Sequence, residues 1–289
     1  MDKNVTDPNL SSLFVDDFAA CIRGQSLQSI ERQMQLIINK ISNWATENGF
    51  TFSLDKTVCI RFIPSCHAKW KPLQPVELKI NNIIIKEVRE AKFLGLVFDR
   101  TLSFIPHIKQ LKTKCKKAMN LLKVVSHQDW GADKDTLLKL YRALIRSKLD
   151  YGAIVYGSAR PSYLKLLDPI QNQALRIATG AFPTSPIPSL YAETGEPPLE
   201  IRRTKVSLSY LTKLSGNPEN PAYKCVLFPE YRNKFIQNSN IIPPLSIRMD
   251  KHLNKLNIAI SHVQTMVKLK CPIYGIYQPY ILIIVFVIF

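Results

Sequence analysis

Apolar residues recur in two different rhythms along this chain, and the rhythm changes near residue 107. Two apolar arms flank a pair of aspartates within residues 10–24, which predicts a strand, a tight turn and a second strand. Apolar positions then fall at three- and four-residue steps over residues 27–46, which predicts an amphipathic helix that ends at Asn48-Gly49. The first hundred residues are therefore expected to mix helix and strand.

Shorter apolar runs after this helix predict more strands. Apolar and polar residues alternate over residues 50–54 and 58–62, which is typical of strands with one buried face. An asparagine pair between apolar arms predicts a hairpin over residues 78–85, and a further strand is expected over residues 92–98.

Helical spacing dominates from residue 107 onward. Asp133 favours the N-cap of a helix, the Asp168-Pro169 pair favours a helix start, and Gly180 favours a helix end. The expected helices cover residues 107–123, 133–149, 168–180 and 199–214. The fold class that follows is α+β, with the strands concentrated in the first hundred residues.

The composition of the chain indicates which class of partner it could bind. The chain has 289 residues, of which 46% are hydrophobic, so it can bury a core. Its 39 Lys and Arg outnumber its 22 Asp and Glu, which gives a formal net charge of +17. So large an excess is uncommon for an enzyme of small molecules, and it fits a polyanion, either nucleic acid or an anionic membrane surface.

The ends of the chain and its cysteines bear on location. Met1–Asn9 is polar and acidic, unlike a signal peptide, so we expect an intracellular location in the nucleus and cytoplasm. The six cysteines form no CxxC pair and are expected to be reduced thiols. Tyr280–Phe289 is an apolar run of ten residues, whereas a bilayer span needs about 20 residues. A membrane partner is therefore not expected, and a tail anchor stays an alternative for this run.

The aspartate pair is the strongest chemical signal in the sequence. It lies in Leu13-Phe14-Val15-Asp16-Asp17, and carboxylates in an apolar run are costly to bury without a neutralising partner. Divalent ions such as Mg²⁺ prefer these oxygen ligands, and a hairpin tip lets both side chains approach one site. An ordinary acidic turn is the alternative for this pentapeptide taken alone.

Longer stretches around the aspartates resemble one protein family. The strings LFVDDFAACIRG, GFTFSLDKTVCIRF and KFLGLVFDRTLSFIPHI follow one another in the order and spacing of the rear half of a reverse-transcriptase palm. DTLLKLYRALIRSKLDYGAIVYG and LKLLDPIQNQALRIATG resemble the thumb of that family and the segment beyond it. Over residues 11–215 the chain is similar to the reverse transcriptases of jockey-like non-LTR retrotransposons.

The resemblance implies catalytic roles for three residues. Asp16 and Asp17 match the aspartates that hold two Mg²⁺ ions for nucleotidyl transfer in the intact family. Lys56 matches a basic residue that helps the pyrophosphate to leave, while a merely exposed lysine is the alternative.

The resemblance also implies a contact with the primer. Phe93, Leu94 and Gly95 match the primer grip, which holds the primer 3′ end in the family. Gly95 would let one backbone approach another closely there. A core strand with a bulge glycine is the alternative, and both interpretations can hold together.

The helix expected over residues 107–123 is the best candidate for nucleic-acid contact. It carries six lysines and no acid, and a thumb helix laid along a duplex would bring its lysines close to phosphates. A solvated helix face is the alternative, and phosphate contacts would hold the backbone without reading sequence. The candidate residues are Lys109, Lys112, Lys116, Lys117 and Lys123, of which all except Lys117 share the face opposite the apolar stripe.

Some parts of the family pattern are missing from this sequence. The intact family needs another aspartate from an earlier palm strand, and Asp2 and Asp7 lie in a polar stretch that predicts no strand. The fingers, which hold template and incoming nucleotide, have no counterpart either. We therefore expect weak or absent Mg²⁺ binding, unpaired sheet edges and no DNA synthesis by this chain alone.

The expected layout follows the resemblance. It consists of a partial palm of antiparallel strands plus helix over residues 1–104, a helical thumb over 105–182, a connection region over 183–272 and an apolar tail of uncertain origin over 273–289. The leading hypothesis for function is a fragment of an RNA-directed DNA polymerase, with an RNA template and a DNA primer as partners and dNTP as the substrate of the intact parent. The alternatives are a non-catalytic nucleic-acid-binding remnant and a tail-anchored membrane protein.

Overall fold

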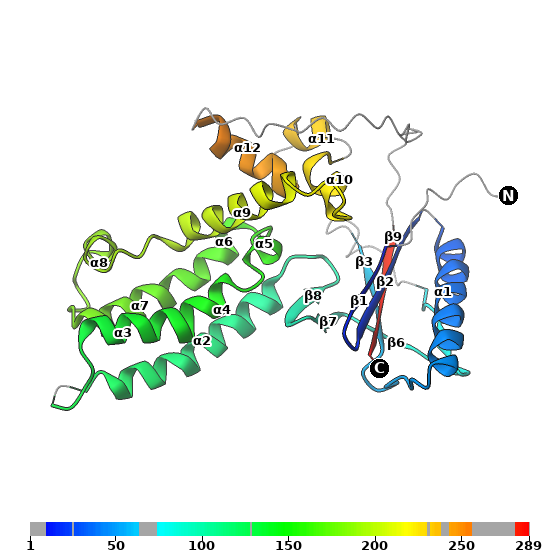
Figure 1. Cartoon of the computed structure of the whole chain (residues 1–289), viewed down its shortest axis with the longest axis horizontal. Coiled ribbons are helices and arrows are strands. Elements are labelled where there is room, and N and C mark those ends of the chain that lie inside the picture. Colours follow the sequence, from blue (N-terminus) through cyan, green and yellow to red (C-terminus); the bar gives the residue numbers. More distant parts are fainter. Residues whose placement is uncertain are drawn as a thin grey trace. The chain divides into compact units, whose positions relative to one another are not determined.

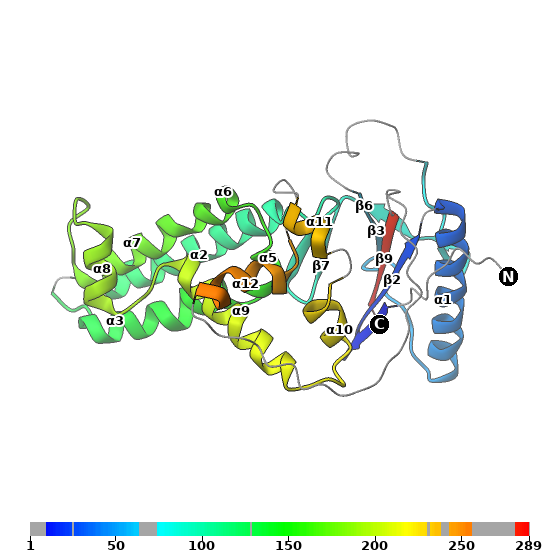
Figure 2. The same ribbon diagram turned by 90° about the horizontal axis from the view of Figure 1, so that it is seen from above.

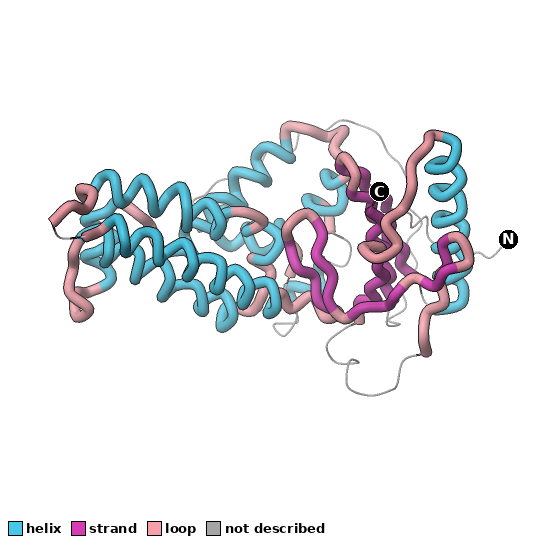
Figure 3. Tube along the Cα trace, turned by 90° about the horizontal axis from the view of Figure 1, so that it is seen from below, coloured by secondary structure: helices cyan, strands magenta, loops and turns pink. Residues whose placement is uncertain are grey.

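The structure is a computed structural model, and it divides the chain into two compact units (Figure 1). Unit 1 comprises Met1–Pro106 together with Lys270–Phe289, and unit 2 comprises His107–Leu269. In the described part of the chain, all strands belong to unit 1 and unit 2 is helical (Figure 3). The mixed α+β class expected from the sequence is confirmed. The described residues are 10–24, 26–63, 74–127, 129–229, 232–237, 243–255 and 281–288.

A five-stranded sheet organises unit 1. Its strands are β1 (Leu10–Phe14), β2 (Asp17–Gly24), β3 (Val58–Phe62), β6 (Lys86–Val88) and β9 (Ile281–Ile288). The spatial order is β1-β2-β9-β3-β6, so β9 lies between β2 and β3 and pairs antiparallel with both. Strand β6 pairs parallel with β3, and β1 pairs antiparallel with β2. The apolar run near the C-terminal end of the sequence is thus the middle strand of this sheet.

The hairpin predicted around the aspartates is confirmed as β1 and β2. Phe14 pairs with Asp17, so Val15 and Asp16 form a two-residue turn. Val15 has a φ of +57°, in the left-handed region that hairpin turns of this length need. This φ is costly for a β-branched residue, so the pairing of the two strands must hold the turn.

Helix α1 (Leu27–Glu47) covers one face of the sheet (Figures 1 and 2). Its apolar stripe was predicted from the three- and four-residue spacing, and Gly49, with a φ of +75°, follows its end as expected. Alternate residues of β2 and β3 point toward this stripe and bury it. The core on this face includes Ala20, Ile22, Ile30, Met34, Ile38 and Cys59.

A second hairpin covers the opposite face of the sheet. It consists of β7 (Glu90–Phe93) and β8 (Leu96–Asp99). The single strand expected over residues 92–98 is therefore wrong, because Leu94 and Gly95, with φ of +44° and +79°, turn the chain back on itself. The core on this face includes Ile60, Phe62, Ala91, Phe93 and Phe98.

The strand expected over residues 50–54 is also wrong. Phe50 stacks on Trp44 of α1 with ring centroids 5.5 Å apart, and Phe52 packs against the core beneath α1. The alternating aromatic residues therefore pack on the helix rather than in the sheet. The hairpin expected over residues 78–85 is confirmed, with strands β4 (Lys79–Ile80) and β5 (Ile83–Ile84).

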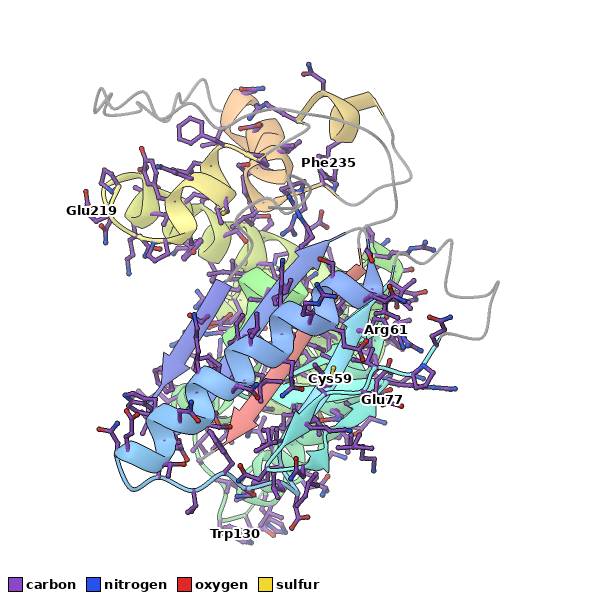
Figure 4. All side chains as sticks on the ribbon, turned by 90° about the vertical axis from the view of Figure 1, so that its right-hand side faces the viewer. Cys59, Arg61, Glu77, Trp130, Glu219 and Phe235 are labelled. Atoms are coloured by element: carbon purple, nitrogen blue, oxygen red, sulfur yellow. The ribbon has the colours of Figure 1, made fainter. Side chains whose placement is uncertain are left out.

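A buried ion pair ties β3 to β6. Arg61 is 2% exposed, and its guanidinium donates to the Glu87 carboxylate and to the Gln74 carbonyl oxygen, each at 2.8 Å. Arg100 donates to the same carboxylate at 2.8 Å. Figure 4 labels Arg61 together with Cys59 on the same strand. Because both charges of the pair are hydrogen-bonded, this polar cluster is tolerated inside the unit.

Unit 2 is a set of packed helices, and all four helices expected from the sequence are confirmed. A π-helical segment, Arg142–Arg146, continues the helix predicted from Asp133, and Gly180 ends another with a φ of +67°. The helices are α2 (Ile105–Val125), α3 (Lys134–Tyr141), α4 (Ser147–Asp150), α5 (Ala153–Tyr156), α6 (Pro161–Leu164), α7 (Asp168–Thr179), α8 (Ile187–Thr194), α9 (Leu199–Ser215), α10 (Ala222–Leu227), α11 (Arg232–Gln237) and α12 (Leu245–Lys255).

Glu196 is a buried acid that joins the π-helical segment to the loop after α8. It is 2% exposed and accepts hydrogen bonds from Arg142 at 2.6 Å and from Arg146 at 2.8 Å. Removing the carboxylate leaves two guanidinium groups without their partner, so Glu196→Gln should lower the free energy of unfolding by about 3 kcal/mol. Glu193→Gln is the matched control.

Glu193 pairs with Lys134 on the surface, where an ion pair contributes less than about 1 kcal/mol. Urea unfolding followed by circular dichroism at 222 nm measures both variants. Equal effects of the two substitutions would show that the Glu196 cluster does not stabilise unit 2.

Two further properties concern the thiols and the membrane. Burial raises the pKa of the Cys59 thiol to about 12 and that of Cys21 and Cys115 to about 11, so these side chains serve as apolar residues. They and Cys225 are free thiols, whereas Cys66 and Cys271 lie outside the described residues. Among the helices of the described chain, none has the length and apolar character needed to cross a bilayer.

Candidate active site and nucleic-acid interface

The aspartate pair stands at the tip of the β1–β2 hairpin. Asp16 is in the turn and is exposed, whereas Asp17 begins β2 and is half-buried. Ala19, two residues further on, packs in the core under the β7–β8 hairpin. Because side chains alternate along a strand, Asp17 belongs to the same sheet face as Ala19.

The strand register brings Lys56 to the same end of the sheet. Asp17 pairs with Ile288 of β9, and Val58 of β3 pairs with Phe286 of β9. Lys56 precedes Val58 by two residues and lies in the turn from which β3 begins. Strands β2 and β3 have one strand between them, so they are separated by two strand spacings, on the order of 10 Å. The aspartate pair and the turn that carries Lys56 therefore lie at one end of the sheet, and the catalytic role of Lys56 stays a prediction.

A second lysine lies at this end and was missed in the sequence. Lys86 is exposed and is the register partner of Val58 in the parallel pairing of β6 with β3. Nothing local in the sequence singles out Lys86, because its position depends on a pairing between segments 28 residues apart. It adds positive charge beside the strand that follows Lys56.

The residues that match the primer grip form the tip of the β7–β8 hairpin. Phe93 pairs with Leu96, and the turn between them consists of Leu94 and Gly95. Phe93 packs in the same core as Ala19, so the hairpin covers the sheet face to which Asp17 belongs. Gly95 acts here as a turn residue rather than a bulge, since its φ of +79° favours glycine.

The described residues supply only part of a two-metal site. No group of three His, Cys, Asp or Glu side chains that could share an ion occurs among them. The strands on either side of Asp17 in the sheet are β1 and β9, and their sequences LSSLF and ILIIVFVI contain no acid. Asp2 and Asp7 lie outside the described residues. Two adjacent carboxylates do not fit the ligand requirement of a pair of divalent ions.

Asp99 fixes the chain between β8 and α2. Its buried carboxylate accepts hydrogen bonds from the Thr101 hydroxyl at 2.7 Å, the Ser103 N–H at 3.1 Å and the Phe104 N–H at 2.7 Å. Burial alone would raise the pKa of Asp99, but these hydrogen bonds outweigh burial and lower it. A lowered folded-state pKa means that this stabilisation is present above the unfolded-state pKa and is lost as the pH falls through the folded-state pKa.

Asp99→Asn should therefore destabilise the chain by about 2 kcal/mol at pH 7, because hydrogen bonds to a charged acceptor are lost. The deficit should shrink as the pH falls below about 4, because the aspartate of the unfolded chain begins to be protonated there while the folded-state carboxylate is still charged. Urea unfolding of both proteins at several pH values between 7 and 3 measures this difference in the free energy of unfolding. A deficit that does not change with pH would show that the charge of Asp99 is not its source.

Helix α2 presents its lysines away from the core of unit 2. Lys109, Lys116, Lys117 and Lys123 are exposed, and Lys112 is half-buried. The helix contains no acid, and none of these lysines forms an ion pair within the described residues. The residues on its buried side are His107, Ile108, Leu111, Cys115, Ala118, Met119 and Leu122.

Several carboxylates of unit 2 are already paired with other cations. Asp150 binds Arg202 at 2.6 Å, and Glu196 holds two arginines. Glu193 and Asp250 pair with Lys134 and Arg232. The charge of α2 is therefore not compensated by these acids, and it remains available to an anionic partner.

Comparison with known proteins finds relatives for much of this chain. The probable RNA-directed DNA polymerase from transposon X-element of Drosophila melanogaster is 24% identical over 186 residues, which are 62% of this chain and 19% of that protein. The RNA-directed DNA polymerase from mobile element jockey of Drosophila funebris is 23% identical over 216 residues, 74% of this chain and 23% of that protein. A retrovirus-related Pol polyprotein from type-1 retrotransposable element R1 of Nasonia vitripennis is 26% identical over 143 residues, 50% of this chain and 42% of that protein.

Over half or more of its length, this chain is similar in sequence to the reverse transcriptases of non-LTR retrotransposons. The resemblance inferred from the sequence motifs is thereby confirmed. No family model and no solved structure matches the chain. It spans between about a fifth and about two fifths of the length of these reverse transcriptases, of which 19%, 23% and 42% are covered. The roles of Asp16, Asp17, Lys56 and the primer-grip residues stay predictions.

Proposed function

We propose that this chain is the rear palm, thumb and connection region of a non-LTR retrotransposon reverse transcriptase. Unit 1 would contribute the palm, and the helices of unit 2 the thumb and connection. The names of the relatives, RNA-directed DNA polymerases of mobile elements, support this assignment. The aspartate hairpin and Lys56 at one end of a sheet are the arrangement that the assignment requires. RNA template and DNA primer are the partners of such a protein, and Mg²⁺ and dNTP belong to the activity of the intact parent.

We propose further that the chain alone binds nucleic-acid backbone without polymerising DNA. The observation that carries this function is α2, a helix with six lysines, no acid and no ion pair from Lys109, Lys112, Lys116, Lys117 or Lys123 among the described residues. Each phosphate that such lysines neutralise releases counterions, so binding should weaken steeply with salt. The partial ligand set at Asp16 and Asp17 argues against catalysis without further residues.

Two assays with a template–primer duplex separate these claims. Fluorescence anisotropy should show binding by the wild-type chain that weakens with salt and is unchanged in Asp16→Ala. Primer extension with Mg²⁺ and dNTPs should give no product with either protein. Templated extension that Asp16→Ala abolishes would overturn the non-catalytic proposal and restore the polymerase alternative. An absence of salt-dependent binding would overturn the proposed function itself.

A further inference from the structure

The loop between α2 and α3 exposes an aromatic side chain beside the lysine-rich helix. Trp130 is 63% exposed, although an indole of this size is usually well buried. Leu121 and Val124, on the last turns of α2, are 58% and 60% exposed. These three exposed apolar side chains lie within a stretch of ten residues, at the end of α2 and in the loop that follows it. Figure 4 labels Trp130 at the lower edge of that view.

Trp130 is held in a defined orientation rather than left free. Its ring stacks on His127 with centroids 5.1 Å apart and planes 14° apart. The His127 ring nitrogen Nδ1 accepts a hydrogen bond from the Asp129 N–H at 3.2 Å, which orients the imidazole. One face of the indole is therefore supported by a second flat ring, and the large exposed area leaves a planar surface for a third.

Gly131 makes this turn possible. Its N–H donates to the His127 carbonyl oxygen at 2.9 Å, and the next residue, Ala132, donates to the Val125 carbonyl oxygen at 2.9 Å. A Cβ at position 131 would lie 2.0 Å from the His127 oxygen, a distance that backbone atoms cannot accommodate. The loop is thus closed tightly around the stacked pair, and any side chain larger than hydrogen at position 131 would displace it.

The lysines of α2 are spread along the helix that ends just before this stacked pair. Lys109 and Lys123 are fourteen residues apart, which corresponds to about 21 Å along a helix axis. That length matches about six nucleotide steps of 3.4 Å. The loop that carries Trp130 follows the C-terminal end of α2, where the Ala132 N–H binds the Val125 carbonyl oxygen. A backbone that follows the lysines toward this end of the helix would therefore bring its next nucleotides to the loop that carries Trp130.

We propose that Trp130, supported by His127, is a stacking platform for unpaired nucleotides of a nucleic acid bound along α2. This inference rests on the proposed backbone binding and adds a single-stranded segment to it. Aromatic side chains next to a basic groove hold single strands because every base offers a π-face, whatever the sequence. An anionic membrane would meet Asp129, whose side chain is 87% exposed beside the indole.

Binding of a blunt duplex, of the same duplex with a six-nucleotide overhang and of an oligo(dT) strand tests this proposal. In the full chain, Trp130→Ala should weaken binding of the overhang duplex and of oligo(dT) about tenfold or more, because one stacked base is lost. Affinity for the blunt duplex and the salt slope should stay unchanged, since no charge is removed. Trp130→Phe should retain most of the affinity, and Gly131→Ala should lose part of it by misplacing the indole.

Trp44→Ala is the matched control, because Trp44 is 45% exposed and belongs to unit 1. It should change none of the three affinities. A chain with Trp44 and Trp70 replaced by phenylalanine keeps Trp130 as its sole tryptophan, and oligo(dT) should quench its fluorescence.

Three results would overturn the inference. One is blunt-duplex binding with no gain from the overhang, and the second is equal losses in Trp130→Ala and Trp44→Ala. The third is a fluorescence response to phosphatidylserine vesicles but not to oligo(dT). Failure to bind even the blunt duplex would instead refute the underlying proposal of backbone binding.

Discussion

Ile284→Pro should unfold unit 1 while leaving unit 2 folded. Ile284 lies in the middle strand β9 and is the register partner of Cys21 on β2 and of Ile60 on β3. Proline donates no backbone hydrogen bond and its ring is not accommodated inside a central strand, so the ladder is broken on one side and distorted on the other. The cost should be about 3 kcal/mol or more, a large share of the stability of a small unit.

Hydrogen exchange followed by mass spectrometry measures this effect unit by unit. The amides of β2 and β3 should lose protection in Ile284→Pro, while those of α2 and α7 should keep theirs. Ile284→Val is the control, since it leaves the backbone ladder intact and should cost no more than about 1.5 kcal/mol. Deletion of residues 281–289 should reproduce the proline result and increase aggregation, because β2 and β3 would each expose an unpaired edge. Persistent protection of β2 and β3 in the proline variant would show that β9 is dispensable for the sheet.

The position of β9 explains why part of the sheet was not foreseen. From the sequence, residues 273–289 are expected to be an apolar tail of uncertain origin, yet residues 281–288 pair with β2 and β3. A continuous apolar run of this length, rich in isoleucine and valine, is typical of a strand that is buried on both faces. That signal was available, but the choice of partners was not, because it depends on segments more than 200 residues away along the chain.

The two errors among the nearby strands have local causes. Leu94 adopts a positive φ, which is uncommon for leucine. The residue types over 92–98 therefore predict a continuous strand and do not indicate the turn. The aromatic residues at positions 50 and 52 alternate like a strand but pack on α1. Helices with regular apolar stripes, such as α1 and α2, were predicted well because their burial pattern repeats within a short window.

Some residues of the candidate site could likewise be predicted from the sequence, and others could not. Two adjacent aspartates in an apolar run identify Asp16 and Asp17 as candidate site residues, and the same pattern predicts their hairpin. Lys86 was missed because only the parallel pairing of β6 with β3 brings it to this end of the sheet. Asp99 gave no signal either, since its role depends on hydrogen-bond donors from three residues that follow it in an irregular segment. Site residues that belong to a local sequence motif can be predicted from the sequence. Site residues whose role depends on strand pairing or burial cannot.

Replacing Lys109, Lys112, Lys116 and Lys123 together with glutamine should nearly abolish duplex binding at moderate salt. Each phosphate contact contributes about 0.9 to the slope of log affinity against log salt on duplex DNA, so losing four should reduce the slope by roughly 3 to 4. At about 0.1 M salt the affinity should fall on the order of a thousandfold. Glutamine keeps a high helix propensity, so α2 should remain folded and circular dichroism should be unchanged.

The control for this variant removes the same charge from elsewhere in unit 2. Lys165, Lys205, Lys213 and Lys224 are all exposed and lie outside α2, and changing them to glutamine gives a chain of identical net charge. If α2 is the contact surface, the control should keep most of the slope and most of the affinity. Equal losses in the two variants would mean that net charge alone attracts the nucleic acid, and the lysines of α2 would then be an ordinary solvated face. A loss confined to the α2 variant places the duplex along this helix, because a long-range field depends on the total charge and a counterion slope depends on the residues that meet phosphates.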